Sequence, residues 1–138
     1  MTPSEQLMKT AMEAWGEGDL EPLRSALHDD VVWISAATEW DDRLRSGGIQ
    51  KGRANVIAHI SKVATAFFIS RYTTKEIVSS GEIVWGIFEV AGRYVDGSHD
   101  KTFKAQTACR WRVREGKIIE HQGFYDTSGL LAQVGYGS

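Results

Sequence analysis

Two segments of this 138-residue chain carry side chains that could perform acid–base chemistry together. Both alternate in the manner of β-strands, so that His121 and Tyr125 share a face of one segment, and Trp85, Ile87 and Glu89 share a face of the other. A carboxylate beside an imidazole orients its tautomer and raises its basicity, and a tyrosine hydroxyl can stabilise a developing oxyanion. We therefore predict His121, Glu89 and Tyr125 as catalytic residues. The alternative is that Glu89 and His121 form a structural pair at a pocket rim or face solvent, and that Tyr125 packs in the core.

The histidines and the single cysteine do not form a metal-binding pattern. His28, His59, His99 and His121 are scattered without an HxH or HxxxH spacing, and we expect His59 on the polar side of its helix. One cysteine can build neither an internal disulfide nor a cysteine-based zinc site. Cys109 would need a lowered pKa to act as a nucleophile, and no base lies near it in the sequence, so we interpret it as an inert core thiol. We expect no metal and no cofactor.

The composition is that of one ordinary soluble domain, with 42% hydrophobic and 25% charged residues. A net charge of -2 argues against a broad basic face and a nucleic-acid partner. No apolar run approaches the roughly 20 residues of a membrane helix, and the polar N-terminal segment does not predict a signal peptide. We therefore expect a cytoplasmic protein without a membrane or nucleic-acid partner. Five Trp, five Phe and four Tyr are more than an ordinary core of this size requires.

The hydrophobic spacing predicts helices first and strands afterwards, which is an α+β pattern. Ser4 is expected to cap a first helix that runs to Trp15, and Asp19 to cap a second short helix. A strand follows at residues 31–34, then a long loop or lid at 36–52, and then a third helix from Arg53 to Phe67. Four long strands separated by turn signals are expected at residues 69–79, 82–95, 101–114 and 117–126. A last short helix, capped by an aspartate, is expected at 129–134. The strands would form an antiparallel sheet that the three preceding helices cover.

This order of elements, together with local motifs, resembles the nuclear transport factor 2-like superfamily, and in particular its SnoaL-like and ketosteroid-isomerase-related domains. The motifs are LEPL to LHDDVVW at 20–33, Gly52-Arg53, EGKIIEH at 115–121, Tyr125-Asp126 and GLLAQVG at 129–135. The resemblance covers nearly the whole chain. It implies a single SnoaL-like domain over residues 1–138, with a cone-shaped, curved antiparallel (mixed) sheet packed around a pocket and a homodimer formed through the outer face of the sheet. It also implies the chemistry of polyketide cyclases and ketosteroid isomerases, in which an apolar cyclic ligand is bound or converted without a metal.

The catalytic residues of those relatives do not all carry over to this chain. The cyclase acid that lies three positions before the terminal aspartate falls at Gly123, the isomerase base falls at Ser35, and the isomerase oxyanion tyrosine falls near Ala11. Hydrolase-like relatives place a functional acid near Glu89, which is present. The missing acids favour a non-catalytic binder of a hydrophobic ligand, whereas Glu89 and His121 favour an enzyme. A protein-interaction module is the third possibility.

The aromatic surplus is predicted to surround the ligand. Alternation places Trp33 with Ser35 on one strand face and Cys109 with Trp111 on another. We therefore expect a hydrophobic, ring-containing small molecule, bound by a largely aromatic wall: Trp15, Trp33, Ser35, Trp40, Phe67, Trp85, Ile87, Cys109, Trp111 and Gly123. On the strand that carries Cys109 and Trp111, the opposite face presents Lys104, Arg110 and Arg112. These three side chains either form ion pairs across the dimer contact or face solvent.

Overall fold

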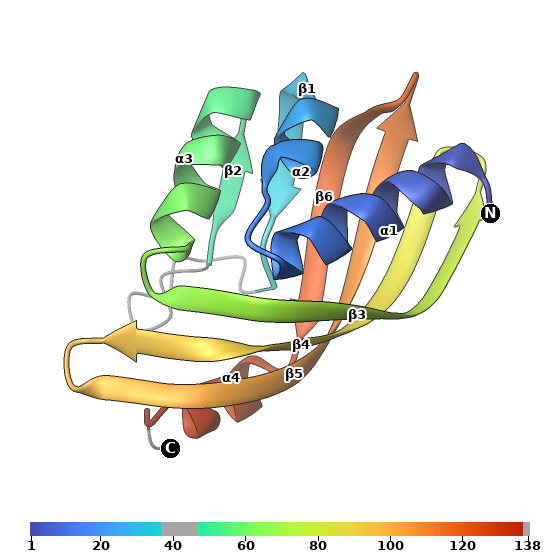
Figure 1. Ribbon diagram of the computed structural model, residues 1–138. Coiled ribbons are helices and arrows are strands. Elements are labelled where there is room, and N and C mark those ends of the chain that lie inside the picture. Colours follow the sequence, from blue (N-terminus) through green and yellow to red (C-terminus); the bar gives the residue numbers. More distant parts are fainter. Residues whose placement is uncertain (37–46, 137–138) are drawn as a thin grey trace.

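One open, mixed sheet of six strands organises the computed structural model, which describes residues 1–36 and 47–136. Across the sheet the strands run β2 (Ile49–Lys51), β1 (Leu27–Ile34), β6 (Lys117–Tyr125), β5 (His99–Arg114), β4 (Ile83–Asp96) and β3 (Phe67–Ser80). Neighbouring strands are antiparallel except β1 and β6, which are parallel. Three helices lie over one side of this curved sheet, and a short fourth helix lies near β5 (Figure 1). The predicted α+β class is confirmed.

The first helix, α1 (Pro3–Gly16), begins earlier than the sequence predicted. Thr2 is its N-cap, because the Thr2 hydroxyl accepts from the Glu5 amide at 3.1 Å while the Glu5 carboxylate accepts from the Thr2 amide. Pro3 occupies the first helical position, where its missing N–H is harmless. The prediction of Ser4 as the cap is therefore wrong. The helix buries Met8, Ala11, Met12 and Gly16.

The other helices agree with the expected positions apart from their ends. In front of α2 (Glu21–Ala26), Asp19 accepts from the Glu21 amide at 3.0 Å, although the N-cap itself is Leu20. The third helix, α3 (Arg53–Val63), ends earlier than predicted, so that Phe67 begins β3 instead of continuing the helix. Asp126 caps α4 (Thr127–Gln133) by accepting from the Gly129 amide at 2.9 Å, as predicted.

The four long strands lie where the alternation and the turn signals placed them. Gly81, Gly97 and Gly116 join them with φ values of 59°, 62° and 76°, a left-handed conformation that glycine adopts without strain. The strand β2 was not predicted, because it lies inside the segment at 36–52 that was taken as a loop. Trp40, and with it the centre of that predicted lid, lies outside the described residues.

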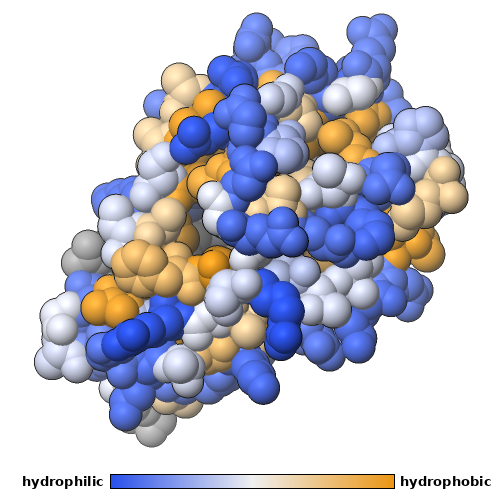
Figure 2. Space-filling model, in the orientation of Figure 1, coloured by the Kyte–Doolittle hydropathy of each residue, from blue (hydrophilic) through white to orange (hydrophobic). Residues whose placement is uncertain are grey.

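Two clusters of buried side chains form the core. The larger one joins α1, α2 and α3 to the sheet, with Trp111, Phe88 and Met8 fully buried in it. The smaller one lies towards α4 and includes Tyr94, Leu130 and Val134. None of the helices in the described ranges is long and apolar enough to span a membrane. In the view of Figure 2 the surface is mostly hydrophilic, and hydrophobic residues gather near the junction of α3 and β3.

Candidate functional site

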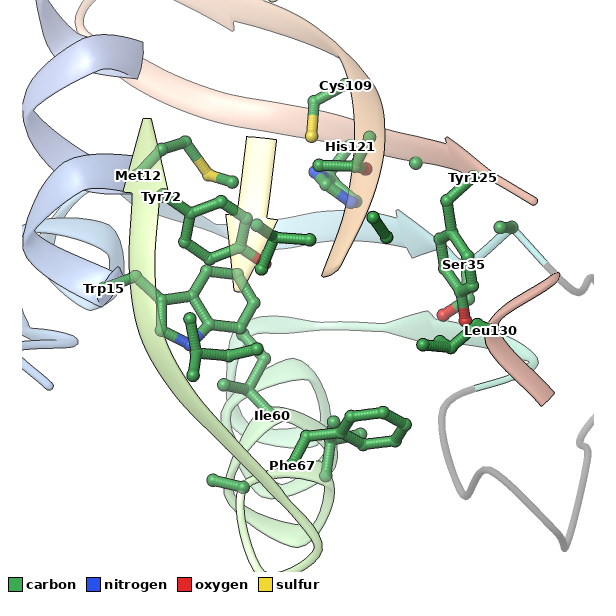
Figure 3. A pocket seen from close by; sticks show the side chains of 18 of the residues that line it. Met12, Trp15, Ser35, Ile60, Phe67, Tyr72, Cys109, His121, Tyr125 and Leu130 are labelled. Carbon is green, nitrogen blue, oxygen red and sulfur yellow. The ribbon is translucent and has the colours of Figure 1, made fainter. Parts of the chain in front are cut away.

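A cavity of about 150 Å³ opens between α1, α3 and the inner face of the sheet. A cavity of this size with apolar walls can hold one aromatic ring. Figure 3 shows its side chains converging from helices and strands on both sides. The described residues that line it are Met12, Trp15, Trp33, Ser35, Ala36, His59, Ile60, Val63, Ala64, Phe67, Ile69, Tyr72, Val90, Phe103, Ala105, Thr107, Cys109, His121, Gly123, Tyr125 and Leu130.

Many of the side chains that the sequence singled out meet at this cavity. On β6, alternation directs residues 121, 123 and 125 to the inner face, and on β5 it directs Cys109 there, opposite Gly123. Their binding and catalytic roles stay predictions. The predicted residues that line the cavity are Trp15, Trp33, Ser35, Phe67, Cys109, His121, Gly123 and Tyr125.

The predicted positions of Glu89, Trp85 and Ile87 inside the pocket are wrong. All three side chains are exposed on the outer face of the sheet, where the Glu89 carboxylate lies 3.4 Å from the Lys75 amine. The proposed pair of Glu89 and His121 is therefore not formed, since the sheet separates the two side chains.

The strand register gives the physical reason for this correction. Gly86 pairs directly with Cys109, and Phe88 with Thr107. Directly opposed residues in an antiparallel pair point to the same face. Since Cys109 and Thr107 line the cavity, Gly86 and Phe88 point inward, and the residues between them on β4 must point outward.

The prediction that Trp111 lines the cavity is wrong, because its side chain lies fully buried beside the cavity. Its indole Nε1 donates a hydrogen bond to His121 Nδ1 at 2.9 Å. On the other side of β6, the ring of Trp33 stacks on the imidazole, with centroids 3.6 Å apart and planes 13° from parallel. Burial, and then the charge of Arg110, lowers the pKa of His121 to about 3. The imidazole is therefore neutral at physiological pH, and its Nδ1 lone pair is occupied.

Two titratable residues of the cavity were missed by the sequence analysis. Tyr72 enters from β3, and burial, followed by the nearby Cys109 and Tyr125, raises the pKa of its phenol. No alternation could have predicted this inward direction, because two register shifts interrupt the pairing of β3 with β4. His59 of α3 is buried in the lining instead of lying on a polar face. Its spacing of three residues after the buried Val56 was a usable signal.

The remaining chemistry of the cavity is that of neutral groups. Burial lowers the pKa of His59, with a further contribution from the Lys62 charge, and burial raises the pKa of the Cys109 thiol to about 12. The thiol therefore stays protonated. Within the described ranges no aspartate or glutamate lines the cavity. The same part of the chain holds no cluster of three or more His, Cys, Asp or Glu side chains that could bind a metal ion.

Comparisons with known proteins give a family and a fold. The SnoaL-like domain family matches residues 8–121. An NTF2-like protein of unknown function from Burkholderia pseudomallei is 24% identical, with a TM-score of 0.81 over 98% of this chain and 99% of its own. IdmH, a candidate polyketide cyclase from Streptomyces antibioticus, is 26% identical, with a TM-score of 0.76 over 98% of this chain and 99% of its own. TerC, crystallised with polyporic acid, is 19% identical, with a TM-score of 0.79 over 96% of this chain and 98% of its own. No curated protein matches the chain in sequence.

Proposed function

This chain belongs to the SnoaL-like domain family, and from that membership and the cavity we propose that it encloses an apolar, ring-containing small molecule and promotes a proton transfer within it. The reaction class is that of the cyclases and isomerases, and it uses general acid–base groups of the protein. Two relatives support the ligand class. IdmH is a candidate polyketide cyclase, and TerC was crystallised with polyporic acid.

The observation that carries this proposal is the convergence of neutral acid–base groups on one apolar cavity. His59 and His121 enter it as imidazoles whose pKa values are lowered by burial, and Tyr72 enters it as a protonated phenol. A neutral imidazole can accept a proton at one nitrogen and donate from the other. His121 already accepts a hydrogen bond from Trp111 at Nδ1, and we assign the proton-accepting role to His59 as the other imidazole of the lining. Tyr125 keeps its proposed role as a hydroxyl donor.

One observation favours a second candidate function, the non-catalytic binding of the same kind of ligand. The general bases that the family's catalysts use are carboxylates, and none lines the cavity within the described ranges. A binder needs only the apolar wall and a few polar groups that orient the ligand.

Deuterium exchange of a small cyclic ketone separates the two functions. We expect the protein to accelerate the exchange of the α-protons of 2-indanone in D₂O, to show saturation with the ketone, and to lose the acceleration when indane competes for the cavity. NMR of the ketone measures the exchange rate. Binding of both compounds without acceleration would support the binder and contradict proton transfer. If neither compound binds, the proposed use of the cavity is wrong.

We also propose that the outer face of the sheet joins two copies of this chain. Trp85, Ile87 and Phe124 are exposed there, and the rings of Trp85 and Phe124 stack with centroids 6.0 Å apart. The nearby Arg110 pairs with Glu120 of the same chain. Because Arg110 has its counter-charge within the chain, a partner need not supply one, and an apolar patch that packs on its own symmetry mate fits this surface.

Replacing Ile87 by glutamate is expected to convert the dimer into a monomer, because it places a carboxylate in the centre of the apolar contact. Sedimentation equilibrium measures the mass of the wild type and of the variant. Ile49→Glu is the matched control, since Ile49 is also exposed but lies on the edge strand β2, which β1, β6 and β5 separate from β4. A wild-type protein that sediments as a monomer would rule out the proposed homodimer.

A further inference from the structure

We infer that His121 serves the cavity as a hydrogen-bond donor of fixed orientation, held by Trp111 and left uncovered by Gly123, and that it thereby selects ligands that carry an accepting carbonyl oxygen. The inference rests on the proposed function, because it concerns the same cavity. It replaces the role of general base that the sequence suggested for His121. It also gives Trp111, which does not line the cavity, a positioning role.

The tautomer of His121 follows from its contact with Trp111. An indole N–H can donate but cannot accept a hydrogen bond. Since the indole nitrogen lies 2.9 Å from Nδ1, that imidazole nitrogen must carry the lone pair. A neutral imidazole has one N–H group, so the proton lies on Nε2. Nε2–H is therefore the donor that His121 has left to offer.

Two tryptophans on neighbouring strands hold the plane and the direction of this ring. His121 lies on β6 directly opposite Trp33 of β1 and directly opposite Trp111 of β5. Trp33 stacks nearly parallel to the imidazole, and Trp111 anchors the Nδ1 edge. Because the anchored edge faces a residue outside the lining, the opposite edge, which carries Nε2, faces the cavity. A donor held in this way loses little conformational entropy when a ligand arrives.

Gly123 keeps the donor accessible. It lies two residues after His121 and shares its face of β6. A β-carbon added to Gly123 would stand 3.3 Å from Nε2 and 3.9 Å from Cε1 of His121. Gly123 is absent from the glycines with positive φ, so the backbone does not require glycine here. What the missing side chain provides is open space in front of Nε2.

The surroundings of His121 favour a neutral carbonyl as its partner. The titratable groups that share its cavity are His59, Tyr72, Cys109 and Tyr125, and no lysine or arginine lines the cavity within the described ranges. A carboxylate ligand would therefore be buried without a counter-ion, at high cost. A hydrocarbon would leave the Nε2–H group without a partner. A ketone oxygen accepts a hydrogen bond from Nε2–H and brings no charge.

A pair of matched ligands tests the selection. We expect the wild-type protein to bind 2-indanone about fivefold more tightly than indane, which corresponds to one net hydrogen bond. In Gly123→Ala, where a methyl group covers Nε2, we expect the preference to disappear while indane still binds. Isothermal titration measures the affinities. Equal affinity of the wild type for both compounds would overturn the inference and leave the cavity proposal intact, whereas a failure of both to bind would reject the cavity proposal itself.

NMR tests the positioning role of Trp111. In the wild type, the ¹⁵N shifts of His121 are expected to show the Nε2–H tautomer alone between pH 5 and 8. In Trp111→Phe, which removes the indole N–H, we expect a mixture of tautomers and a weaker preference for 2-indanone. A wild-type spectrum with the Nδ1–H tautomer, or with a protonated ring, would overturn the inference even if the Trp111 variant does not fold. An unchanged tautomer in a folded Trp111→Phe would show that Trp111 does not position the ring.

Discussion

Replacing His121 by leucine is expected to slow the protein-dependent exchange of the α-protons of 2-indanone by about 10²–10³-fold, the usual effect of removing a donor from a developing oxyanion. When a base removes an α-proton, negative charge moves to the ketone oxygen. The Nε2–H of His121 faces the cavity in surroundings of low polarity, where a hydrogen bond is stronger than in water. Leucine has nearly the same bulk but cannot donate. NMR of the ketone in D₂O measures the rate.

Two controls make this experiment specific. His28→Leu introduces the same change at an exposed histidine of β1 and should leave the exchange rate unchanged. The leucine at position 121 also leaves the Trp111 indole N–H without its acceptor, at a cost of about 1–3 kcal/mol in stability. The rates should therefore be compared well below the melting temperature of each variant. An exchange rate in His121→Leu equal to that of the wild type would show that His121 does not act on the ketone.

The second large effect is expected at the contact between α1 and β3. Gly16→Ala should destabilise the fold by about 3 kcal/mol, at the upper end of the usual cost of overpacking. A β-carbon at Gly16 would stand 2.3 Å from the backbone nitrogen of Tyr72 and 2.9 Å from the carbonyl carbon of Arg71. Backbone atoms cannot rotate away as a side chain can, so the helix and the strand must separate. Thermal unfolding followed by circular dichroism should show a melting temperature lower by about 10 °C.

Gly18→Ala is the matched control for this prediction. Gly18 lies two residues further on and has a φ of 84°, but nothing lies within 4 Å of its added β-carbon. Its substitution should cost only the strain of a left-handed alanine, about 1–2 kcal/mol. If Gly16→Ala proves no more destabilising than Gly18→Ala, the close approach of α1 to β3 does not limit stability. Since Tyr72 lines the cavity, Gly16→Ala should also weaken the binding of 2-indanone.

The elements of the fold could be predicted because local signals specify them. The glycine turns at Gly81, Gly97 and Gly116 mark the ends of the long strands, and Asp126 marks the start of α4. The strand β2 could not be predicted in this way. It spans three residues, and its pairing with β1 depends on a tertiary contact, that of Gln50 with Trp33.

The candidate site was predicted correctly on those strands whose inward-facing side chains were identified correctly. On β5 and β6 the inward positions were assigned correctly, and Cys109, His121 and Gly123 lie where expected. On β4 the assignment was reversed. The hairpin turn at Gly97 specifies the register that would have corrected this assignment. If Asp96 pairs with His99 across a two-residue turn, counting along both strands away from the turn places Gly86 opposite Cys109. Pairing through the turn, and not the hydrophobicity of Trp85 and Ile87, decides which face is buried.

The chemical state of His121 lay beyond the sequence. Its neutrality follows from burial and the nearby charge of Arg110. Its tautomer follows from the Trp111 indole at Nδ1, a contact between two strands whose residues are ten positions apart in the chain. A histidine in an alternating strand is equally compatible with a base, a donor or a solvent-exposed cation. Only the three-dimensional arrangement separates these states.

The parallel contact between β1 and β6 has a consequence for the order in which the chain can fold. β1 ends at Ile34, whereas β6 begins at Lys117. During synthesis from the N-terminus, one edge of β1 therefore has no partner until nearly the whole domain has emerged. Until then the apolar sides of α1 and α3 lack the completed sheet, and the ring of Trp33 lacks His121. We therefore expect the sheet to be completed late, because the pairing of β1 with β6 must close a long stretch of chain, and the closure of such a distant contact is slow.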